Sequence, residues 1–378
     1  MPRVIFAGAF ASGHGYSNSD VTMRLLRSQF DCLDCGQALA DGMHLWRYAG
    51  RRWGRVGLAA RLVLVNLWSL LRVLWKVRAG DVVYVRYPSL FFMLWVGMLP
   101  GFIRPRCVID AYISIWDAWV NDRGYMRTSR ISSALRRLEA FSYKAAWKVL
   151  VDTTANGDFM TERFGLAPAD VMVIPLAIDE QAWATVAQPA QFGKRSAKPK
   201  LSVVYLGTFV PLHGLQVVVD AIKQLAHLAD VEYVFIGDGQ QAHILEELIE
   251  QMPRGCRITW MRGFYAPEEV VPFIRSADVA LGVFGGTGKA SRVLPFKLYI
   301  HLLLGKCVVT QRAHSTPDVA MEIPAVFADT AAELAAALEA LCASRHLVDS
   351  FGKRAATFYR LHLSNASVLK RWCEMLRC

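Results

Sequence analysis

Short apolar segments alternate with longer amphipathic segments along most of the chain. The segments with the length and the branched or aromatic composition of buried strands are Val4–Ala9, Val82–Val85, Cys107–Ile109, Val149–Val151, Val171–Ile174, Leu201–Leu206, Tyr233–Ile236, Ile258–Trp260, Val279–Val283, Cys307–Thr310 and Ala325–Phe327. Strands of a parallel sheet are covered by helices on both faces, which makes their sequences almost continuously apolar. The pattern therefore predicts an α/β protein with mostly parallel sheets.

The strand series is interrupted by a polar stretch, Gln188–Lys200, which has two prolines, a glycine and four basic residues. Such a composition is typical of a linker. A chain of 378 residues is long enough for two domains of ordinary size. We therefore predict two Rossmann-like lobes, residues 1–185 and 201–350, joined by a linker over residues 186–200. A final helix, expected over residues 347–376, is predicted to extend back toward the first lobe.

One segment departs from the alternation of strands and helices. From Gly42 to Gly80 the chain has no Asp or Glu but many Arg and Lys residues. On a helical wheel Arg61, Arg72 and Lys76 fall in one narrow arc, and leucines and tryptophans occupy most of the rest. This pattern is typical of a helix in a membrane interface, with its cations toward anionic headgroups. The alternative is a buried lobe helix with a solvated basic stripe.

Two uncharged apolar runs are too short to predict a membrane-spanning segment. Pro88–Ile103 has no charge, but a helix of that length reaches about 24 Å, against about 30 Å for the hydrocarbon core. Val4–Ala11 is at the short end for a signal peptide and runs directly into a glycine-containing loop. We therefore expect a cytoplasmic protein, peripheral at the inner face of the cell membrane where the basic helix binds lipid.

Composition and charge exclude several classes of protein. With 54% hydrophobic and 20% charged residues, the chain is not intrinsically disordered. The net charge of +11, concentrated in the first half, favours an anionic partner: nucleic acid, lipid or a small molecule. No nucleic-acid-binding motif is present and the aromatic residues lie in apolar runs, so we predict no nucleic-acid partner. The eight cysteines form no complete zinc motif, and no carboxylate cluster predicts a metal site.

Glycine-containing loops follow several predicted strands in the C-terminal half. The loop Gly207–Gly214 lies between the strand Leu201–Leu206 and a helix, and Gly237–Gly239 follows the next strand. Unpaired backbone N–H groups at such strand–helix junctions bind anions. Ligands of open α/β sheets bind at the carboxyl ends of the strands, so the two loops together predict a phosphate site.

A third loop, Gly285–Arg292, combines small residues with two cations. Small residues let the backbone approach a ligand, and Lys289 and Arg292 can neutralise a diphosphate. The loop is not a P-loop, because Ala290 stands where a magnesium-binding Ser or Thr is needed. The alternative is a flexible surface turn with solvated charges. A helix beginning near Lys297 follows this loop.

With these three loops the chain resembles GT-B glycosyltransferases of the family 4, or group 1, type. The resemblance is strongest over Leu201–Thr310 and weaker over Asp81–Asp179. It implies an α/β fold of two Rossmann-like lobes whose parallel sheets face each other across a cleft. It also implies a nucleotide-sugar donor as co-substrate, retention of anomeric configuration, and no cofactor or obligatory metal.

Candidate site residues follow from the loops and from the resemblance. The family's diphosphate-binding Gly-Arg and Lys-Gly pairs correspond to Gly207-Thr208 and His213-Gly214, and its Pro-x-Lys helix start corresponds to Pro295–Lys297. The predicted donor-binding residues are Gly13, Gly15, Gly207, Thr208, His213, Gly214, Arg262, Gly286, Thr287 and Lys297. The predicted catalytic residues are Lys289 and Arg292, which stabilise the departing diphosphate, and Asp110, an acceptor-side acid/base group. A loop hydrogen bond or helix cap is the alternative role of Asp110.

Two positions depart from the family pattern. The two family glutamates, one for the sugar and one for the ribose, correspond to Arg292 and Ile300. Some branches of the family carry Arg at the first position. An aliphatic side chain at the second cannot accept a hydrogen bond from a ribose hydroxyl, and the neighbouring His301 faces about 100° away on a helix.

The predicted function is transfer of a sugar from a nucleotide sugar to a cell-surface glycan or a lipid-linked acceptor. The first alternative is a non-catalytic GT-B homologue that organises a membrane-associated glycan biosynthesis complex, which Thr208 and Ile300 favour. The second alternative, a Rossmann-type oxidoreductase, lacks the strand-following G-x-G-x-x-G with an acidic residue about 20 positions later.

Overall fold

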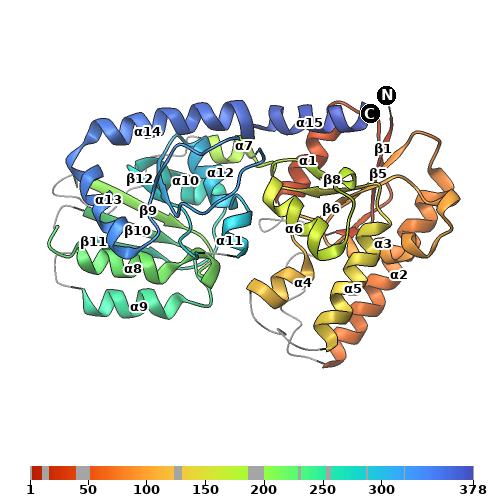
Figure 1. Ribbon diagram of the computed structural model, residues 1–378, viewed down its shortest axis with the longest axis horizontal. Coiled ribbons are helices and arrows are strands. Elements are labelled where there is room, and N and C mark those ends of the chain that lie inside the picture. Colours follow the sequence, from red (N-terminus) through yellow and green to blue (C-terminus); the bar gives the residue numbers. More distant parts are fainter. Residues whose placement is uncertain are drawn as a thin grey trace. The chain divides into compact units, whose positions relative to one another are not determined.

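The computed structural model describes residues 2–10, 17–39, 52–122, 130–185, 200–228, 231–252, 257–286, 288–318 and 320–377. The chain divides into two compact units. The N-terminal unit comprises residues 1–177 and 365–378, and the C-terminal unit comprises residues 178–364. Each unit is built on a six-stranded sheet with helices on both faces (Figure 1).

The sheet of the N-terminal unit has the strand order β3-β1-β5-β6-β7-β8, and every pairing is parallel. Its strands are β1 (Val4–Ala7), β3 (Cys32–Asp34), β5 (Val82–Val85), β6 (Cys107–Asp110), β7 (Lys148–Val151) and β8 (Val171–Val173). A separate short pair joins β2 (Ala9–Phe10) to β4 (Gln37–Ala38).

Helices cover both faces of this sheet. One face packs against α1 (Ser17–Arg27) and α15 (Asn365–Arg377), and the other against α2 (Arg52–Lys76), α3 (Leu90–Met98), α5 (Arg130–Lys144) and α6 (Thr154–Phe164). Shorter turns are η3 (Gly101–Ile103), α4 (Ile115–Asp117), η4 (Ala118–Asp122) and η5 (Pro168–Asp170). No helix in the described part of the chain is both long and apolar enough to span a bilayer.

The sheet of the C-terminal unit has the order β11-β10-β9-β12-β13-β14 and is also parallel throughout. Its strands are β9 (Leu201–Leu206), β10 (Val231–Ile236), β11 (Arg257–Met261), β12 (Val279–Leu281), β13 (Cys307–Thr310) and β14 (Ala325–Phe327). One face is covered by α8 (Leu215–Gln224), α9 (Ala242–Gln251), α13 (Ala331–Ala343) and α14 (Arg345–Phe358), and the other by α7 (Glu180–Ala184), α10 (Pro267–Ser276) and α12 (Phe296–Leu303). The turns η6 (Pro211–His213), α11 (Lys289–Arg292) and η7 (Tyr359–Leu363) complete the unit.

Burial on both faces explains why the strands were visible in the sequence. In β9, Val203 and Tyr205 join the core on one face of the sheet, whereas Val204 joins the core on the other face. Each predicted strand segment overlaps an observed strand. The prediction missed β3, a partly buried edge strand, because Cys32, Leu33 and Asp34 do not form an apolar run.

The chain passes between the units twice. Ile174 and Ala177 still belong to the core of the N-terminal unit, whereas Trp183 of α7 packs in the core of the C-terminal unit. The first passage therefore precedes the predicted linker at residues 186–200, of which residues 186–199 lie outside the described part. At the second passage the expected single helix is two helices, because Ser364 is extended (φ −62°, ψ 156°) between η7 and α15.

The returning helix α15 completes the core of the N-terminal unit. Trp372 is fully buried, and its ring centroid lies 5.0 Å from that of Tyr84 on β5. Burial of an aromatic pair of this kind contributes several kcal/mol.

Candidate donor-binding site in the C-terminal unit

Glycine backbones hold together the loops that follow β9 and β10. A Cβ on Gly237 would lie 1.9 Å from the carbonyl oxygen of Gly207, and one on Gly239 would lie 2.8 Å from the nitrogen of Phe209. The Phe209 N–H donates to the oxygen of Asp238 (3.0 Å). Only glycine permits so close an approach of two backbones. The two loops therefore form one surface at the carboxyl edge of the sheet.

The loop after β12 joins this surface through a second glycine contact. Gly214 has φ +65° at the start of α8, and a Cβ there would lie 2.3 Å from the carbonyl carbon of Phe284. A Cβ on Gly285 would lie 2.2 Å from the oxygen of Leu212. The Phe284 N–H donates to the oxygen of His213 (3.2 Å). The first turn of α8, with its outward N–H groups, therefore lies beside the loop after β12.

Lys297 is a buried cation directly beneath these loops. Its Nζ donates to the carbonyl oxygen of Gly282 (3.3 Å) and lies 4.3 Å from the ring centroid of Tyr205. A Cβ on Gly207 would lie 2.8 Å from this Nζ. Burial lowers the pKa of Lys297 to about 7, because the charged form loses hydration that these contacts only partly replace. An ammonium at this place is paired with no carboxylate that the structure describes, and an anionic ligand would stabilise it.

His213 lies beside Lys297 with a neutral ring. A Cβ on Gly207 would lie 3.2 Å from His213 Cε1, and Nδ1 of His213 is hydrogen-bonded to the oxygen of Thr208. Burial, and secondly the charge of Lys297, hold the pKa of His213 well below its usual value. Because a carbonyl only accepts, Nδ1 carries the proton and Nε2 remains an acceptor. His213 can therefore orient a ligand, whereas the positive charge comes from Lys297.

Gln311 fixes the loop that carries Gly286, and the sequence analysis did not single it out. The buried Gln311 amide accepts from the Gly286 N–H (2.8 Å) and donates to the Gly286 oxygen (2.9 Å). The only feature of the sequence that could have indicated Gln311 is its position directly after the strand β13. Thr287, the next predicted residue, lies outside the described part of the chain.

Lys289 and Arg292 lie on the short helix α11, which contacts η6. Both side chains are half-buried and both have interactions within the protein. The contact with η6 brings the two predicted cations toward the loop of His213 and Gly214. The structure therefore gathers Lys289, Arg292 and Lys297 around the same three loops.

Arg262 follows β11 and is held by two carboxylates. Its guanidinium donates to Asp238 (3.2 Å) and Glu246 (2.5 Å) and lies 4.8 Å from the ring centroid of Trp260. The side chain remains half-exposed. This arrangement bridges the ends of β10 and β11, and the flat guanidinium could still border a nucleotide base.

Ile300 and His301 are both inside the protein. Ile300 packs in the core with Val204 and Ala280, so the position of the second family glutamate offers no hydrogen-bond acceptor to a ligand. His301 is fully buried, and burial lowers its pKa to about 3. Neither nitrogen of His301 has a hydrogen-bond partner among the described residues.

Asp110 ends β6 in the N-terminal unit. Its carboxylate accepts from the Tyr112 N–H (3.3 Å), which is the loop hydrogen bond left open as its alternative role. Burial raises the pKa of Asp110 to about 7. Arg86 follows β5, the strand beside β6 in the sheet, and lies near Asp110. Its buried guanidinium is paired with Asp20 (2.6 Å) and stacked on Phe10. A carboxyl with this pKa can both give and take a proton near neutral pH.

Replacing Asp110 with Asn should stabilise the protein at pH 8 but not at pH 4. The raised pKa means that the stability contributed by protonated Asp110 is complete below pH 4 and is lost as the pH rises through 7. Asn never ionises, so the variant should gain about 4 kcal/mol at pH 8, because the pKa of Asp110 is raised from 3.8 to about 7 and each pKa unit corresponds to about 1.36 kcal/mol. Urea unfolding at both values measures this difference. An equal effect at both values would contradict the raised pKa, and a 10²–10⁴-fold loss of turnover would support the acid/base role.

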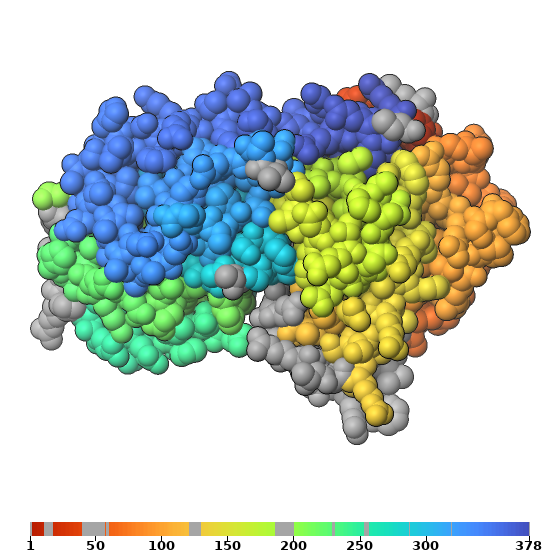
Figure 2. Space-filling model, viewed as in Figure 1, coloured from red at the N-terminus to blue at the C-terminus, as the bar shows by residue number. Residues whose placement is uncertain are grey.

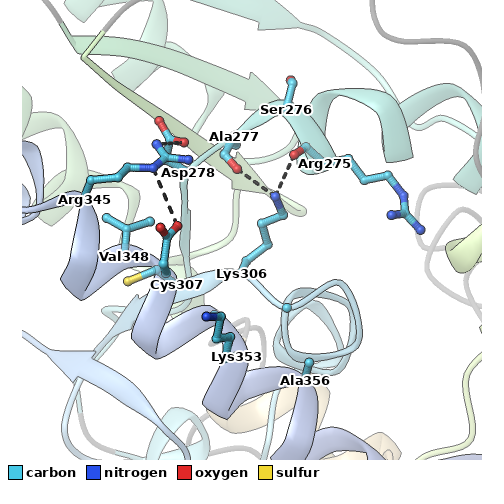
Figure 3. Close-up of a pocket in the computed structure, with 13 residues that line it drawn as sticks. Arg275, Ser276, Ala277, Asp278, Lys306, Cys307, Arg345, Val348, Lys353 and Ala356 are labelled. Carbon is cyan, nitrogen blue, oxygen red and sulfur yellow. Dashed lines mark hydrogen bonds and ion pairs between the residues drawn. The ribbon is translucent and has the colours of Figure 1, made fainter.

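A cavity of about 550 Å³ lies at the opposite, amino edge of the C-terminal sheet and contains none of the predicted site residues. Figure 3 shows Lys306 donating to the carbonyls of Arg275 (2.7 Å) and Ala277 (2.8 Å), and Arg345 paired with Asp278. Because Lys306, Arg345 and Asp278 already have partners within the protein, we do not assign the donor to this cavity.

Comparison with known proteins identifies the fold. No protein-family model matches the chain, and neither does any curated protein. Among solved structures it is similar over its full length to HepE from Anabaena in complex with UDP-glucose, with a TM-score of 0.68 and 14% identity, covering 100% of both chains. The chain has the GT-B fold.

Further GT-B structures are similar to it. Sucrose-phosphate synthase from Thermosynechococcus elongatus has a TM-score of 0.67 and 13% identity, with 100% of this chain and 98% of that chain covered. WaaG, a glycosyltransferase involved in lipopolysaccharide biosynthesis, has a TM-score of 0.61 and 13% identity, with 99% of both chains covered. The prediction of two Rossmann-like lobes with parallel sheets is confirmed.

Within this GT-B fold the predicted residues fall into four groups. Those that surround one set of loops in the C-terminal unit are Gly207, Thr208, His213, Gly214, Gly286, Lys289, Arg292 and Lys297. Arg262 lies at the end of the neighbouring strand β11, and Asp110 lies in the other unit. Gly13, Gly15 and Thr287 lie outside the described residues.

Proposed function

We propose that the chain is a nucleotide-sugar-dependent glycosyltransferase of the family 4 type. The observation that supports this most directly is Lys297, a buried ammonium beneath three glycine loops. Holding an uncompensated cation there costs stability, and a diphosphate would remove that cost. The HepE structure contains UDP-glucose, so UDP-sugars are the first donors to test.

The residues of this site have distinct proposed roles. Lys297 and the first N–H groups of α8 hold the diphosphate. Lys289 and Arg292 stabilise the charge that develops as the diphosphate departs, which is the step where fixed cations lower the barrier most. His213 orients the donor through Nε2. The sugar is transferred to the acceptor with retention of its anomeric configuration, and no cofactor or metal takes part.

The acceptor is proposed to be a cell-surface glycan, carried on a lipid at the inner face of the membrane. The support is the basic character of the first half of the chain and the absence of acidic residues between Gly42 and Gly80. The similarity to WaaG, a glycosyltransferase involved in lipopolysaccharide biosynthesis, agrees with a surface glycan.

A hydrolysis screen tests the enzymatic function. Purified protein is incubated with UDP-sugars, GDP-sugars and other nucleotide sugars, and release of free nucleotide is measured. Slow turnover of one donor establishes the activity and names the donor class. Absence of both turnover and calorimetric binding across the panel would refute the proposal.

Replacing Arg292 with Ala should abolish most turnover and leave the fold intact. The half-buried Arg292 neutralises the departing diphosphate in the proposed mechanism, and loss of one such group costs about 10²–10³-fold. The matched control is Arg360→Ala, an exposed arginine on η7. Turnover of the Arg292 variant near that of the control would remove Arg292 from the mechanism.

A second candidate is a non-catalytic GT-B homologue that organises a glycan biosynthesis complex. The specific observation in its favour is Ile300, which is in the core where the family has a ribose-binding glutamate. Calorimetry of donor binding and the hydrolysis screen, taken together, separate the two functions. Donor binding together with hydrolysis supports the enzyme, and binding without hydrolysis, in the presence of acceptor glycans, supports the homologue.

A further inference from the structure

Helix α2 exposes an apolar stripe on the side opposite the protein core. Leu62, Leu70 and Val73 are buried against the sheet. On the other side Leu64, Trp68, Leu71 and Trp75 are exposed, with Trp68 at 65% and Trp75 at 84%. The outer side of a helix on a globular protein is ordinarily polar, so this stripe is the feature to be explained.

Buried hydrogen bonds prevent α2 from turning this stripe inward. Asn66 accepts from the Ala9 N–H (2.9 Å), and Ser69 accepts from the Gly8 N–H (2.9 Å) and donates to the oxygen of Cys35 (2.8 Å). Rotation of the helix would leave these buried polar groups without partners, at a cost of about 1–3 kcal/mol each. The outward direction of the tryptophans is therefore a built feature of the fold.

The neighbouring helix α3 and its following turn also expose apolar side chains. Met98, Phe102 and Ile103 lie at its end, and Phe102 is 90% exposed. The indole of Trp95 donates to the oxygen of Val63 on α2 (3.2 Å), which ties α3 to α2. Figure 2 shows that the orange part of the chain, which includes α2 and α3, reaches the surface of the N-terminal unit.

Helix α5, packed against α3, continues the pattern. Gly97 lies against the ring of Phe141, so closely that a Cβ there would be 2.6 Å from it. Ile131, Leu138 and Phe141 are exposed along α5. We call the outward side of α2, α3, η3 and α5 the apolar face. Exposed apolar areas spread over several elements mark binding surfaces on soluble proteins.

The charged side chains around the apolar face, on the elements that form it, are basic. Arg61 on α2, Arg104 after η3, and Arg137 and Lys144 on α5 are exposed, and Lys76 on α2 is half-buried. Residues 57–80 and 90–106 contain no Asp or Glu. The single acid of α5, Glu139, is buried and accepts hydrogen bonds from Ser114, Ile115, Trp116 and Tyr143.

We propose that the apolar face docks onto an anionic lipid bilayer, with its tryptophans at headgroup level and its cations on acidic lipids. Tryptophan beside Arg and Lys is the composition of membrane-interface helices. A bilayer is favoured over a protein partner because the basic rim is complementary to a continuous anionic surface. The proposal deepens the proposed function, since it gives a glycosyltransferase with a lipid-linked acceptor the surface by which it reaches that acceptor.

Vesicle co-sedimentation of the full chain tests the docking. We expect binding to vesicles of phosphatidylcholine with phosphatidylglycerol, little binding to phosphatidylcholine alone, and weakening by salt. The variant Trp68→Ala/Trp75→Ala should lose about tenfold or more in partitioning. The variant Arg61→Gln/Lys76→Gln should partition about twentyfold less onto anionic vesicles and unchanged onto neutral ones, since each cation increases partitioning onto anionic lipid about fivefold.

Matched controls come from the C-terminal unit. Ile249 and Leu361 are exposed there by 43% and 59%, and Ile249→Ala/Leu361→Ala should bind vesicles like the wild type. Circular dichroism checks that each variant folds. Equal pelleting of the tryptophan variant and the wild type, or none of either, overturns the proposal. Self-association that the tryptophan variant abolishes, without vesicle binding, assigns the face to a second copy instead.

The docking proposal and the proposed enzymatic activity are tested by separate measurements, so either can be refuted without the other. Nucleotide-sugar hydrolysis is measured without lipid, and vesicle binding is measured without a nucleotide sugar. Hydrolysis without vesicle binding would refute only the docking. Vesicle binding without hydrolysis or donor binding would refute only the transferase.

Discussion

Replacing Lys297 with Met is expected to reduce donor turnover at least about 100-fold while making the protein more stable below pH 7. The ammonium is buried beneath the three glycine loops of the candidate site, and Met fills the same space without a charge. Its pKa of about 7 lies far below the value of about 10.4 in an unfolded chain. The folded state therefore bears the full cost of burying the charge below pH 7, and this cost decreases as the pH rises toward 10.4. The gain in the free energy of unfolding should be on the order of 4 to 5 kcal/mol at pH 6 and should fall below about 1 kcal/mol near pH 10.

Calorimetry of UDP binding tests the same residue without turnover. A diphosphate stabilises the ammonium, so at pH 8 the wild type should take up a proton on binding, seen as a dependence of the heat on buffer ionisation enthalpy. The Lys297→Met variant should show no such uptake. Its control is Lys306→Met, because Lys306 also has a lowered pKa, about 8, but lies at the opposite edge of the sheet. Equal turnover losses in the two variants would argue against a specific role for Lys297.

Replacing Gly237 with Ala is expected to cost about 3 kcal/mol or more and to remove donor binding. The new Cβ would lie 1.9 Å from the oxygen of Gly207, so the loops after β9 and β10 must separate. The same separation moves Gly207 away from Lys297 and His213. Urea unfolding and UDP calorimetry measure the two effects.

Gly101→Ala is the control for this backbone contact. Gly101 has no atom within 4 Å of an added Cβ and no positive φ, so its substitution should change the free energy of unfolding by less than about 0.5 kcal/mol. An unfolding midpoint for Gly237→Ala equal to that of the control would contradict the close packing of the two loops.

The candidate site was only partly predictable. Gly207 and Gly214 were found because a glycine loop after an apolar strand is a local pattern. Lys297 was found only through the resemblance to the family's Pro-x-Lys helix start. Gln311 was not, because its bonds to Gly286 join residues 25 apart in the sequence. The ion pairs of Arg262 with Asp238 and Glu246 likewise depend on strand order, which local patterns do not contain.

The apolar face, too, was predictable from the sequence only in part. The run without acids and its leucines and tryptophans were evident in the sequence, and they left two interpretations open. Which leucines face the core was decided by Asn66 and Ser69, whose partners Ala9, Gly8 and Cys35 lie more than 30 residues away. The structure thereby separates Leu62 and Leu70 from Leu64 and Leu71.

The sequence by itself determined the parallel strands, the two units and the place of the three glycine loops, because burial on both faces of a sheet and sharp glycine turns leave a local pattern of residue types. Only the tertiary structure decided the electrostatics: the lowered pKa of Lys297, the neutral ring of His213 and the raised pKa of Asp110. It also decided that Ile300 lies in the core. The physical reason is that hydration and packing depend on neighbours brought together from distant parts of the chain, which no local pattern records.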